Sequence, residues 1–222
     1  MSFKMITFLI FSIIVTCVFI ALGTWQLQRL EWKTNLLAKI EARVSATPIA
    51  LPSTPDPIAD KYLRVTVTGD ISTQELHVLT STNGTPGFKI IAVMDLPDGR
   101  RILVDRGFVA GANKNASRNG GITNATGALL WPIETDKYTP APDREDNLWF
   151  ARDVELMSAE LNTAPILLSI TASDNNENVT PQPVQINIHN RHLEYVLTWY
   201  GFAIIWVGMT GLLIWRNTRQ PQ

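Results

Sequence analysis

One histidine and a set of aromatic residues share one face of a predicted helix near the end of the chain. His192 lies just before an uncharged stretch that runs from Val196 to Trp215. At about 100° per residue, the aromatic residues that fall near its face are Tyr195, Trp199, Phe202 and Trp206. A neutral imidazole ligates haem iron well, and aromatic walls suit a flat apolar macrocycle. Aromatic residues are also typical of the interface belt of a membrane helix, and both interpretations stay open here.

A second group of aromatic and basic residues follows the apolar stretch at the start of the chain. Trp25, Arg29 and Trp32 share one face of a predicted helix. Arg29 could pair with a ligand carboxylate such as a haem propionate. The alternative is a membrane anchor, in which the long Arg side chain reaches the polar interface. If both apolar stretches cross a membrane, this group and His192 emerge at the same surface.

Residues of the kinds that catalyse reactions are scarce in this chain. Its three histidines are His77, His189 and His192, and its one cysteine, Cys17, lies inside the first apolar stretch. The sequence contains no HExxH motif, phosphate-binding loop or dinucleotide fingerprint. A lone cysteine makes neither an internal disulfide nor a two-cysteine redox or copper site. We therefore assign no catalytic residue and expect that the protein is not an enzyme.

Two uncharged stretches are long enough to cross a lipid bilayer. The first runs from Met5 to Leu22 and the second from Val196 to Trp215, and about 18–20 such residues span the hydrocarbon core as a helix. A cleaved signal peptide is the alternative for the first stretch, but its apolar core is typically only about 7–15 residues long. We therefore predict transmembrane helices at 5–23 and 195–215, an extramembrane domain at 24–190 and a tail at 216–222.

Basic residues beside the two stretches predict their orientation. Lys4 precedes the first stretch, and Arg216 and Arg219 follow the second. Such residues favour the cytoplasmic side, so both termini are expected in the cytoplasm and the central domain in the periplasm. No transit-peptide pattern precedes the first stretch, which favours a multi-pass protein of a bacterial inner membrane. The net charge of −1 leaves no basic excess for nucleic acid, so the expected non-protein partner is the lipid bilayer.

The central region has the pattern of a β-rich domain. Apolar and polar residues predict strands at 63–68, 75–80, 89–96, 101–109 and 166–171, and an extended segment at 185–188. Asp98-Gly99 predicts a two-residue hairpin turn, and residues 113–124 predict an exposed polar loop. Asp153 is the expected N-cap of a short helix. The fold class is thus a membrane α+β protein, in which two terminal transmembrane helices flank a mostly antiparallel β domain with one or two short helices.

Two helical features lie next to the predicted spans. Residues 23–43 continue from the first span with an approximate helical stripe of leucines. Gly201 and Gly208 lie nearly opposite the His192 face of the second span. Small residues favour the close packing of helices in lipid, so these glycines predict the surface on which the two helices meet.

Five motifs, in order along nearly the whole chain, resemble the surfeit locus protein 1 family. Gly23–Lys33 reads GTWQLQRLEWK and is similar to its G-x-W-Q-x-x-R-x-x-x-K motif. Asn190–Tyr200 reads NRHLEYVLTWY and is similar to its N-x-H-L-x-Y-x-x-T-W-F/Y motif. The segments that resemble its central domain are Gly84–Phe88, Leu103–Val109 and Leu148–Phe150. Asp105 and Phe108 depart from the pattern, which usually has Asn and Trp there.

The resemblance implies a role in the assembly of haem-copper cytochrome c oxidase. It implies that haem a is held transiently and delivered to, or inserted into, the catalytic subunit of the oxidase. That subunit and the enzymes of haem a synthesis are the implied partners. By position, His192 would be the axial ligand of the haem iron, and Arg106 would make a polar contact in the central domain. The other residues that the resemblance places at the cofactor are Tyr195, Trp199, Trp25, Gln26 and Arg29.

Two other functions fit the same topology. A membrane-anchored scaffold could stabilise an oxidase assembly intermediate without binding haem. An enzyme could act inside the membrane, but the few histidines, the lipid-facing Cys17 and the lack of a carboxylate inside either apolar stretch count against it. The scaffold and the haem carrier differ in whether the partner or the cofactor binds first.

Overall fold

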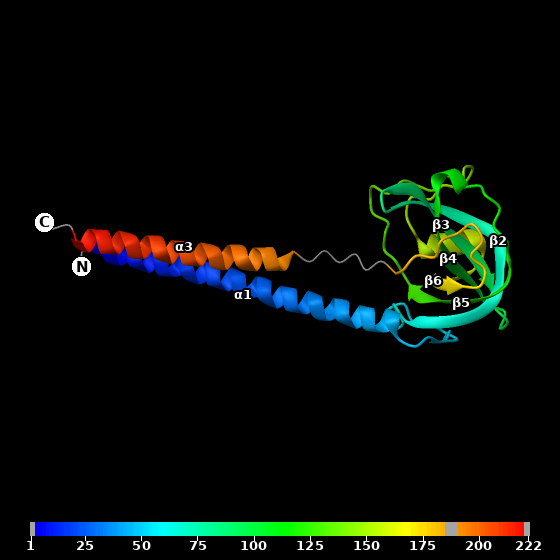
Figure 1. Cartoon of the computed structure of the whole chain (residues 1–222), viewed down its shortest axis with the longest axis horizontal. Helices are drawn as coiled ribbons and strands as arrows, with labels where there is room; N and C mark the ends of the chain where they lie inside the picture. Colours follow the sequence, from blue (N-terminus) through cyan, green and yellow to red (C-terminus); the bar gives the residue numbers. More distant parts are fainter. Residues whose placement is uncertain (1–2, 185–190, 220–222) are drawn as a thin grey trace. The chain divides into compact units, whose positions relative to one another are not determined.

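The computed structural model describes residues 3–184 and 191–219, which fall into two compact units (Figure 1). One unit comprises residues 1–39 and 186–222, and the other comprises residues 40–185. Helix α1 (Phe3–Ser45) contributes to both units, and helix α3 (His192–Arg219) belongs to the first. His189 and the extended segment expected at 185–188 lie outside the described residues.

Helices α1 and α3 lie side by side and antiparallel in the first unit (Figure 1). The hydroxyl of Ser12 is 2.7 Å from that of Thr210, and the hydroxyl of Thr24 is 3.0 Å from that of Tyr200. Residue numbers therefore increase along α1 in the direction in which they decrease along α3. This pairing brings residues from opposite ends of the sequence together.

Aromatic residues of α3 pack against α1. Phe19 of α1 stacks on Trp199 with ring centroids 6.0 Å apart, and its ring centroid lies 5.9 Å from that of Phe202. Phe11 meets the ring of Trp206 edge-on at 6.3 Å. Such contacts are favourable beyond the apolar area that they cover. The aromatic face predicted from the sequence is therefore, in large part, the face that α3 turns toward α1.

The glycine that matters for this helix pair lies in α1 rather than in α3. A Cβ at Gly23 would lie 2.9 Å from the ring of Tyr200, which is closer than real side chains approach. A Cβ at Gly201 or Gly208 would meet nothing within 4 Å. The prediction that Gly201 and Gly208 form the packing surface is therefore wrong, because the aromatic face of α3 occupies the interface instead.

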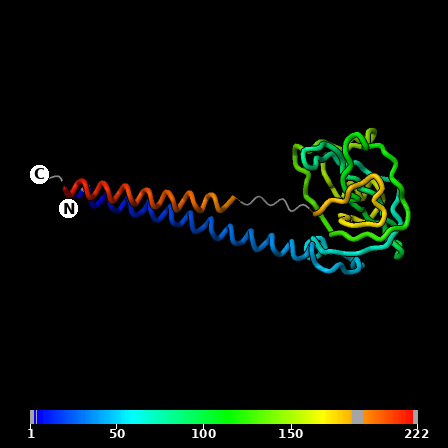
Figure 2. Tube along the Cα trace, in the orientation of Figure 1, coloured from blue at the N-terminus to red at the C-terminus, as the bar shows by residue number. Residues whose placement is uncertain are grey.

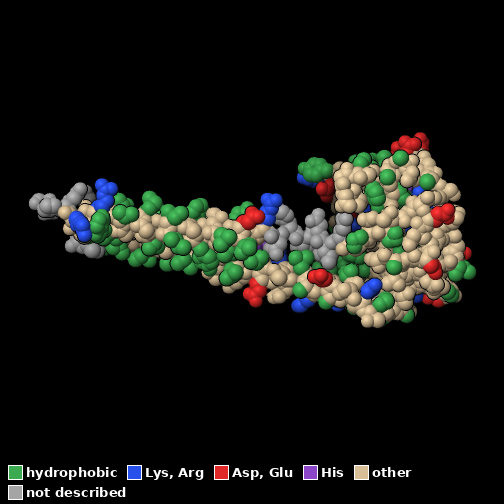
Figure 3. All heavy atoms as spheres, viewed as in Figure 1, with side chains coloured by type: hydrophobic (Ala, Val, Ile, Leu, Met, Phe, Trp, Pro, Cys, Tyr) green, Lys and Arg blue, Asp and Glu red, His purple; other side chains and the backbone are tan. Residues whose placement is uncertain are grey.

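Both helices are long and apolar enough to cross a bilayer. The most apolar windows of Met5–Ser45 and His192–Arg219 have mean hydropathies of 2.8 and 1.7, and only 6% of each window is buried. Hydrophobic side chains gather over both helices in the space-filling view (Figure 3). Side chains this apolar and this exposed call for lipid around them. Helix α1 continues beyond the predicted span to Ser45, so the limits of the spans within these helices stay a prediction.

Within the described part of the second unit, six strands form one mixed sheet. They are β1 (Ile49–Ala50), β2 (Arg64–Thr82), β3 (Thr85–Asp95), β4 (Arg101–Ala110), β5 (Gly121–Leu130) and β6 (Ala164–Ser173). The order is β1-β2-β3-β4-β6-β5, and β2 also pairs with β5, so the sheet closes into a barrel. The pairs β1–β2 and β4–β6 are parallel and the others are antiparallel. The predicted α+β fold, with two apolar terminal helices around a mostly antiparallel domain, is confirmed.

Strand β2 closes the barrel because it pairs on both sides; Figure 2 shows its trace curving along the domain. Residues Arg64–Ile71 pair with β5, and residues Asp70–Thr82 pair with β3. The register shifts between Ile71 and Glu75, and such irregularities let a strand bend. The strands predicted at 63–68 and 75–80 are therefore two parts of one bent strand.

Two local predictions differ from the structure. The predicted hairpin does join β3 to β4, but its turn is longer than two residues, because the N–H of Leu96 donates to the carbonyl oxygen of Arg100 at 2.8 Å. Gly99 has a positive φ of 84°, whereas Asp98 does not, so the turn is not of type I′. Residues 113–124 are not one exposed loop. They include the last residue of the 3₁₀ turn η1 (Gly111–Asn113), a buried Arg118 and the start of β5.

The sheet separates two apolar cores. The barrel interior holds buried residues from all five of its strands: Val65, Val67, Ile71, Ala92, Met94, Ile102, Val104, Ala125, Leu129, Ile166, Leu168 and Ile170. Helix α2 (Val154–Leu161) buries Met157 and Leu161 in the second core, outside the barrel. Asp153 caps this helix by accepting from the N–H of Leu156 at 3.0 Å, which confirms the predicted cap.

Substitution of Gly23 by Val should push the helix pair apart, because the new side chain would meet the ring of Tyr200. Helix separations depend on the side chains at the contact, so we expect an increase of about 1–2 Å. Pulsed electron paramagnetic resonance would measure it between spin labels at Val18 and Ile204, which are 49% and 73% exposed, in a Cys17→Ser background. Gly208→Val is the matched control and should leave the distance unchanged. Equal distances in wild type and Gly23→Val would show that this contact does not set the separation.

Candidate functional site

The residues that follow the first apolar stretch meet those that precede the second. Nδ1 of His192 lies 2.6 Å from Oε1 of Gln26. Gln26 follows Gly23 by about one helical turn, and Gly23 admits Tyr200 of α3 close to the α1 backbone. Both side chains of the hydrogen-bonded pair are half-buried. The structure therefore brings Gln26 and His192, two of the predicted site residues, into direct contact.

This hydrogen bond fixes which imidazole nitrogen carries the proton. The oxygen of a Gln amide only accepts hydrogen bonds, so Nδ1 of a neutral His192 must donate. Nε2 then presents a lone pair, and it makes no hydrogen bond to any residue that the structure describes. Histidines that bind metals usually donate their other N–H to a protein acceptor in this way. The pair thus has the chemistry of an oriented, neutral, single-nitrogen ligand.

Two basic residues of α1 place positive charge near this histidine. Arg29 and Lys33 lie about one and two turns beyond Gln26, close enough for their charges to act on the imidazole. Arg29 is exposed and also covers the ring of Trp32, with its Cζ 4.1 Å from the ring centroid. A ligand that carries carboxylates would be attracted to this position.

The predicted aromatic residues divide into two groups. Trp25 and Tyr195 are 55% and 52% exposed, so their rings are accessible to a ligand. Trp199 is half-buried and stacks on Phe19 between the helices. It therefore contributes to helix packing, and its availability as a wall of a ligand site is limited.

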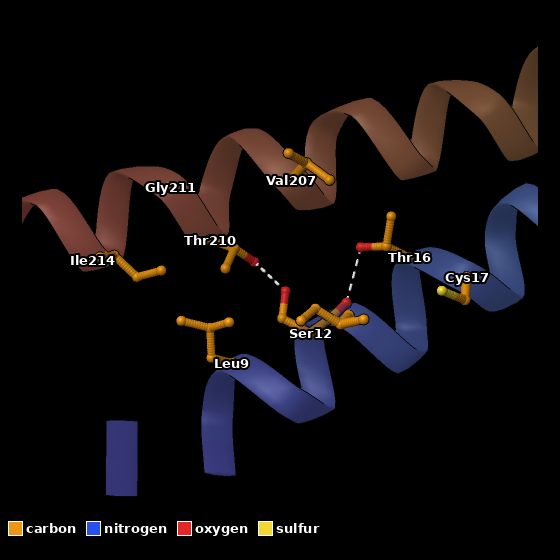
Figure 4. Close-up of a pocket in the computed structure, with 9 residues that line it drawn as sticks. Leu9, Ser12, Thr16, Cys17, Val207, Thr210, Gly211 and Ile214 are labelled. Atoms are coloured by element: carbon orange, nitrogen blue, oxygen red, sulfur yellow. Dashed lines mark hydrogen bonds between the residues drawn. The ribbon is translucent and has the colours of Figure 1, made fainter. Parts of the chain in front are cut away.

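A pocket that sequence reasoning did not indicate lies toward the other end of the helix pair (Figure 4). Its volume is about 350 Å³, and its lining is Leu9, Ser12, Ile13, Thr16, Cys17, Val207, Thr210, Gly211 and Ile214. The Ser12 and Thr210 hydroxyls bond to each other, and Thr16 donates to the carbonyl oxygen of Ser12 at 2.8 Å. Because these hydroxyls are already bonded within the pair, the pocket offers mainly apolar surface.

In the β domain, Asp105 stands where the resemblance leads one to expect Asn, and the structure compensates its charge. The side chain is 1% exposed and lies 3.2 Å from Nζ of Lys89 and 3.3 Å from Nη1 of Arg152. Arg152 also pairs with Glu134. Burial opposes ionisation of Glu134, but the hydrogen bonds and charge of Arg152 outweigh it and lower its pKa. Asp105 therefore belongs to an internal ionic network of the fold.

Sequence reasoning missed a second buried ionic cluster in the same domain. Arg118 is 5% exposed and donates from Nε to Oε1 of Glu75 at 2.9 Å. The same oxygen lies 2.9 Å from Nε2 of His77. Burial opposes ionisation of Glu75, but its hydrogen bonds to His77 and Arg118 lower its pKa overall. The available signal was the alternation of β2, which places polar residues 75 and 77 on the side opposite Leu76 and Val78.

The remaining predicted residue, Arg106, lies in the β domain and is 2% exposed. It belongs to a different unit from His192. Within the described ranges, no group of three or more His, Cys, Asp or Glu side chains could hold a metal ion. A metal centre at His192 would therefore have one protein ligand from these residues.

Comparisons with known proteins agree on one family. The model of the SURF1 family matches residues 13–204. A SURF1-like protein of Monosiga brevicollis is 32% identical over 216 residues, covering 88% of this chain and 83% of its own length. Surfeit locus protein 1 of Rattus norvegicus is 29% identical over 87% of this chain and 71% of its own length. A SURF1-like protein of the bacterium Rickettsia felis is 29% identical over 86% of this chain and 90% of its own length.

The Gln26 contact predicts the tautomer of His192 without any ligand. In the wild-type chain, ¹⁵N NMR of the side chain should show the proton on Nδ1, because Gln26 accepts from it. Gln26→Leu removes the acceptor, so the population should shift toward the Nε2–H tautomer. Gln28→Leu is the matched control, because Gln28 is exposed on the same helix. A dominant Nδ1–H form that persists in Gln26→Leu would rule out this role of Gln26.

Proposed function

The chain belongs to the SURF1 family, and on this premise we propose that it is an assembly factor for haem-copper cytochrome c oxidase. It binds haem a transiently as cargo and assists its delivery to, or insertion into, the catalytic subunit. It catalyses no reaction of its own. The catalytic subunit and the enzymes of haem a synthesis are its partners.

One observation carries this proposal. His192 is held by Gln26 at 2.6 Å through Nδ1, so Nε2 is left as an unprotonated donor at the start of α3. An imidazole in this state is the common axial ligand of haem iron. Its acceptor comes from the other motif that carries the family resemblance. The hydrogen bond therefore gives the two motifs a shared role at one site. Separate roles as membrane anchors would not explain this contact.

The surroundings of His192 suit the other parts of a haem. Arg29 is exposed, and the positive charges of Arg29 and Lys33 act at His192, so they can attract propionate groups. Trp25 and Tyr195 offer exposed aromatic surface to the macrocycle. Trp199 supports this site from within the helix pair, because it stacks on Phe19.

A site of this kind favours transfer over storage. One imidazole supplies orientation, and partly exposed aromatic surface supplies affinity without enclosing the cargo. An acceptor that offers a second ligand and a closed pocket would bind the same haem more tightly. Haem a would then move to the catalytic subunit by difference in affinity, without a chemical step.

The proposed location is a bacterial inner membrane, with both termini in the cytoplasm and the β domain in the periplasm. Nδ2 of Asn217 lies 3.7 Å from Sδ of Met5, so the first turns of α1 and the last turns of α3 lie at the same end of the pair. Arg216 and Arg219 lie at that end, and basic residues favour the cytoplasmic side. The His192–Gln26 pair lies toward the opposite end, which this orientation assigns to the periplasmic surface.

A second function, a scaffold that holds an oxidase intermediate without binding haem, is favoured by one feature of the β domain. Ile58 and Ile133 are 88% and 91% exposed and border a pocket of about 540 Å³. Exposed apolar surface of this kind is typical of sites that a partner covers. The scaffold and the haem carrier are compatible in one protein, but they predict different effects of a missing haem.

The haem proposal predicts that His192→Ala loses most of its haem a. The chain would be coexpressed with haem a synthesis enzymes, purified in detergent, and its haem a content measured by absorption spectroscopy. Gln26→Leu should weaken binding by about 10–100-fold, the usual effect of removing the partner of a metal-bound histidine. Leu193→Ala is the matched control, because its side chain is 54% exposed beside His192 and makes no iron contact.

Circular dichroism on the same samples would show whether the β domain of each variant is folded. Equal haem a in wild type and His192→Ala would remove His192 from the role. A wild-type chain that purifies without haem a, yet captures the catalytic subunit from cells that lack haem a, would favour the scaffold instead.

A further inference from the structure

A buried guanidinium on the barrel side of the sheet makes no direct ion pair with any described residue. Arg106 is 2% exposed, and its Nε and Nη1 make no hydrogen bond to any described residue. Its Nη2 donates to the carbonyl oxygen of Asn119 at 3.2 Å and lies 3.5 Å from Oδ1 of Asn175. Both of these acceptors are neutral. A guanidinium stays charged in proteins, so its burial without an anion is unfavourable.

Arg106 follows the alternation of Ile102 and Val104, which face the barrel interior, and it lies at a bulge in β4. Ile91 pairs with Asp105 and Ile90 pairs with Gly107, so Arg106 is the extra residue between two ladder positions. Gly107 has a φ of +127°, and a Cβ there would lie 2.2 Å from the carbonyl oxygen of Thr180. Bulges of this kind re-aim a side chain and are common next to functional sites. Asp105 points to the opposite side, where Lys89 and Arg152 neutralise it.

Glu75, the carboxylate whose charge acts most strongly on Arg106, is already bonded to other residues. Both carboxylate oxygens of Glu75 accept from Arg118, and one of them also contacts His77. Burial lowers the pKa of Arg106, the charges of Glu75 and Glu177 oppose this, and the charge of Arg118 adds to it. Two guanidinium groups therefore share one buried carboxylate, and the carboxylate of Glu177, which also acts on Arg106, is exposed.

Two short segments lie over Arg106 and are held together by side-chain hydrogen bonds. Residues 117–120 and 175–178 are joined by hydrogen bonds from Asn178 to the carbonyl oxygen of Ser117 at 2.8 Å and from Asn175 to that of Asn119 at 3.3 Å. Asn119 also donates to Glu177 at the rim. These bonds join side chains to backbone or to one another, so opening the cover leaves the strand ladders intact.

We propose that Arg106 is the base of an anion-binding site in the β domain, which takes a small oxyanion such as a carboxylate or phosphate beneath residues 117–120. The planar guanidinium matches the oxygens of both classes, and the anion supplies the missing charge. The site is independent of His192 and of haem.

The test uses the full chain in detergent, with ¹⁵N-labelled arginine. Sodium acetate and sodium phosphate are titrated separately against sodium chloride at matched ionic strength, and the two arms distinguish a carboxylate site from a phosphate site. The buried Nε–H groups of Arg106 and Arg118 are recognised by slow hydrogen exchange. They differ from each other because only Arg118 donates from Nε to Glu75. A saturable shift of the Arg106 signal with one of the two anions is expected.

Thermal unfolding provides the second measurement. An anion that binds the folded chain raises Tm as its concentration exceeds the dissociation constant. This rise should be lost in Arg106→Lys and kept in Arg144→Lys, since Arg144 is an exposed arginine paired with Glu160. An Arg106 signal that neither anion shifts, or a Tm response that is equal in wild type and Arg106→Lys, would overturn the proposal. If Arg106→Lys does not fold, the titration of the wild-type chain decides alone.

Discussion

Tyr200 packs against the backbone of α1 at Gly23, and this contact sets how closely the two apolar helices approach each other. The hydrogen bond between His192 and Gln26 needs that approach, because it joins two short side chains from different helices at 2.6 Å. The aromatic contacts of Phe19 and Phe11 extend the same pairing along the helices. The glycine at position 23 thus determines whether the hydrogen bond between Gln26 and His192 can form.

In the β domain, buried charged residues lie on both sides of the sheet. Asp105 and Arg106 lie on opposite sides of the sheet, because successive side chains of a strand alternate. Outside the barrel, Asp105 has two cationic partners. Inside it, Glu75 accepts hydrogen bonds from Arg118, and Nε and Nη1 of Arg106 have no hydrogen-bond partner among the described residues. Two adjacent residues of one strand thus differ in their surroundings: Asp105 is paired on one face, and Arg106 has unpartnered nitrogens on the other.

The sequence predicted what depends on local pattern. Apolar length indicated both terminal helices, alternation indicated most strands, and Asp153 indicated the start of α2. It did not predict β5 (Gly121–Leu130), because the Gly, Asn and Thr residues at its start become a strand only by pairing with distant β2. The burial of Arg118 depends on its contact with Glu75 of β2, and Arg106 contacts Asn119 and Asn175, which are also distant in the sequence. At the candidate site, the motifs predicted His192 and Gln26, but not that Trp199 is used for helix packing, which depends on how α3 is rotated.

The topology of the barrel also sets the order in which the chain can fold. Strand β2 must hold both β3 and β5, and the ring closes only when β6 enters between β4 and β5. Because β6 is the last of these strands to be synthesised, the ring stays open until most of the β domain has been made. Pairings between distant segments form slowly and leave strand edges exposed meanwhile. The unfinished sheet of a nascent chain therefore has free edges until β6 is made, and aggregation is a risk during that interval.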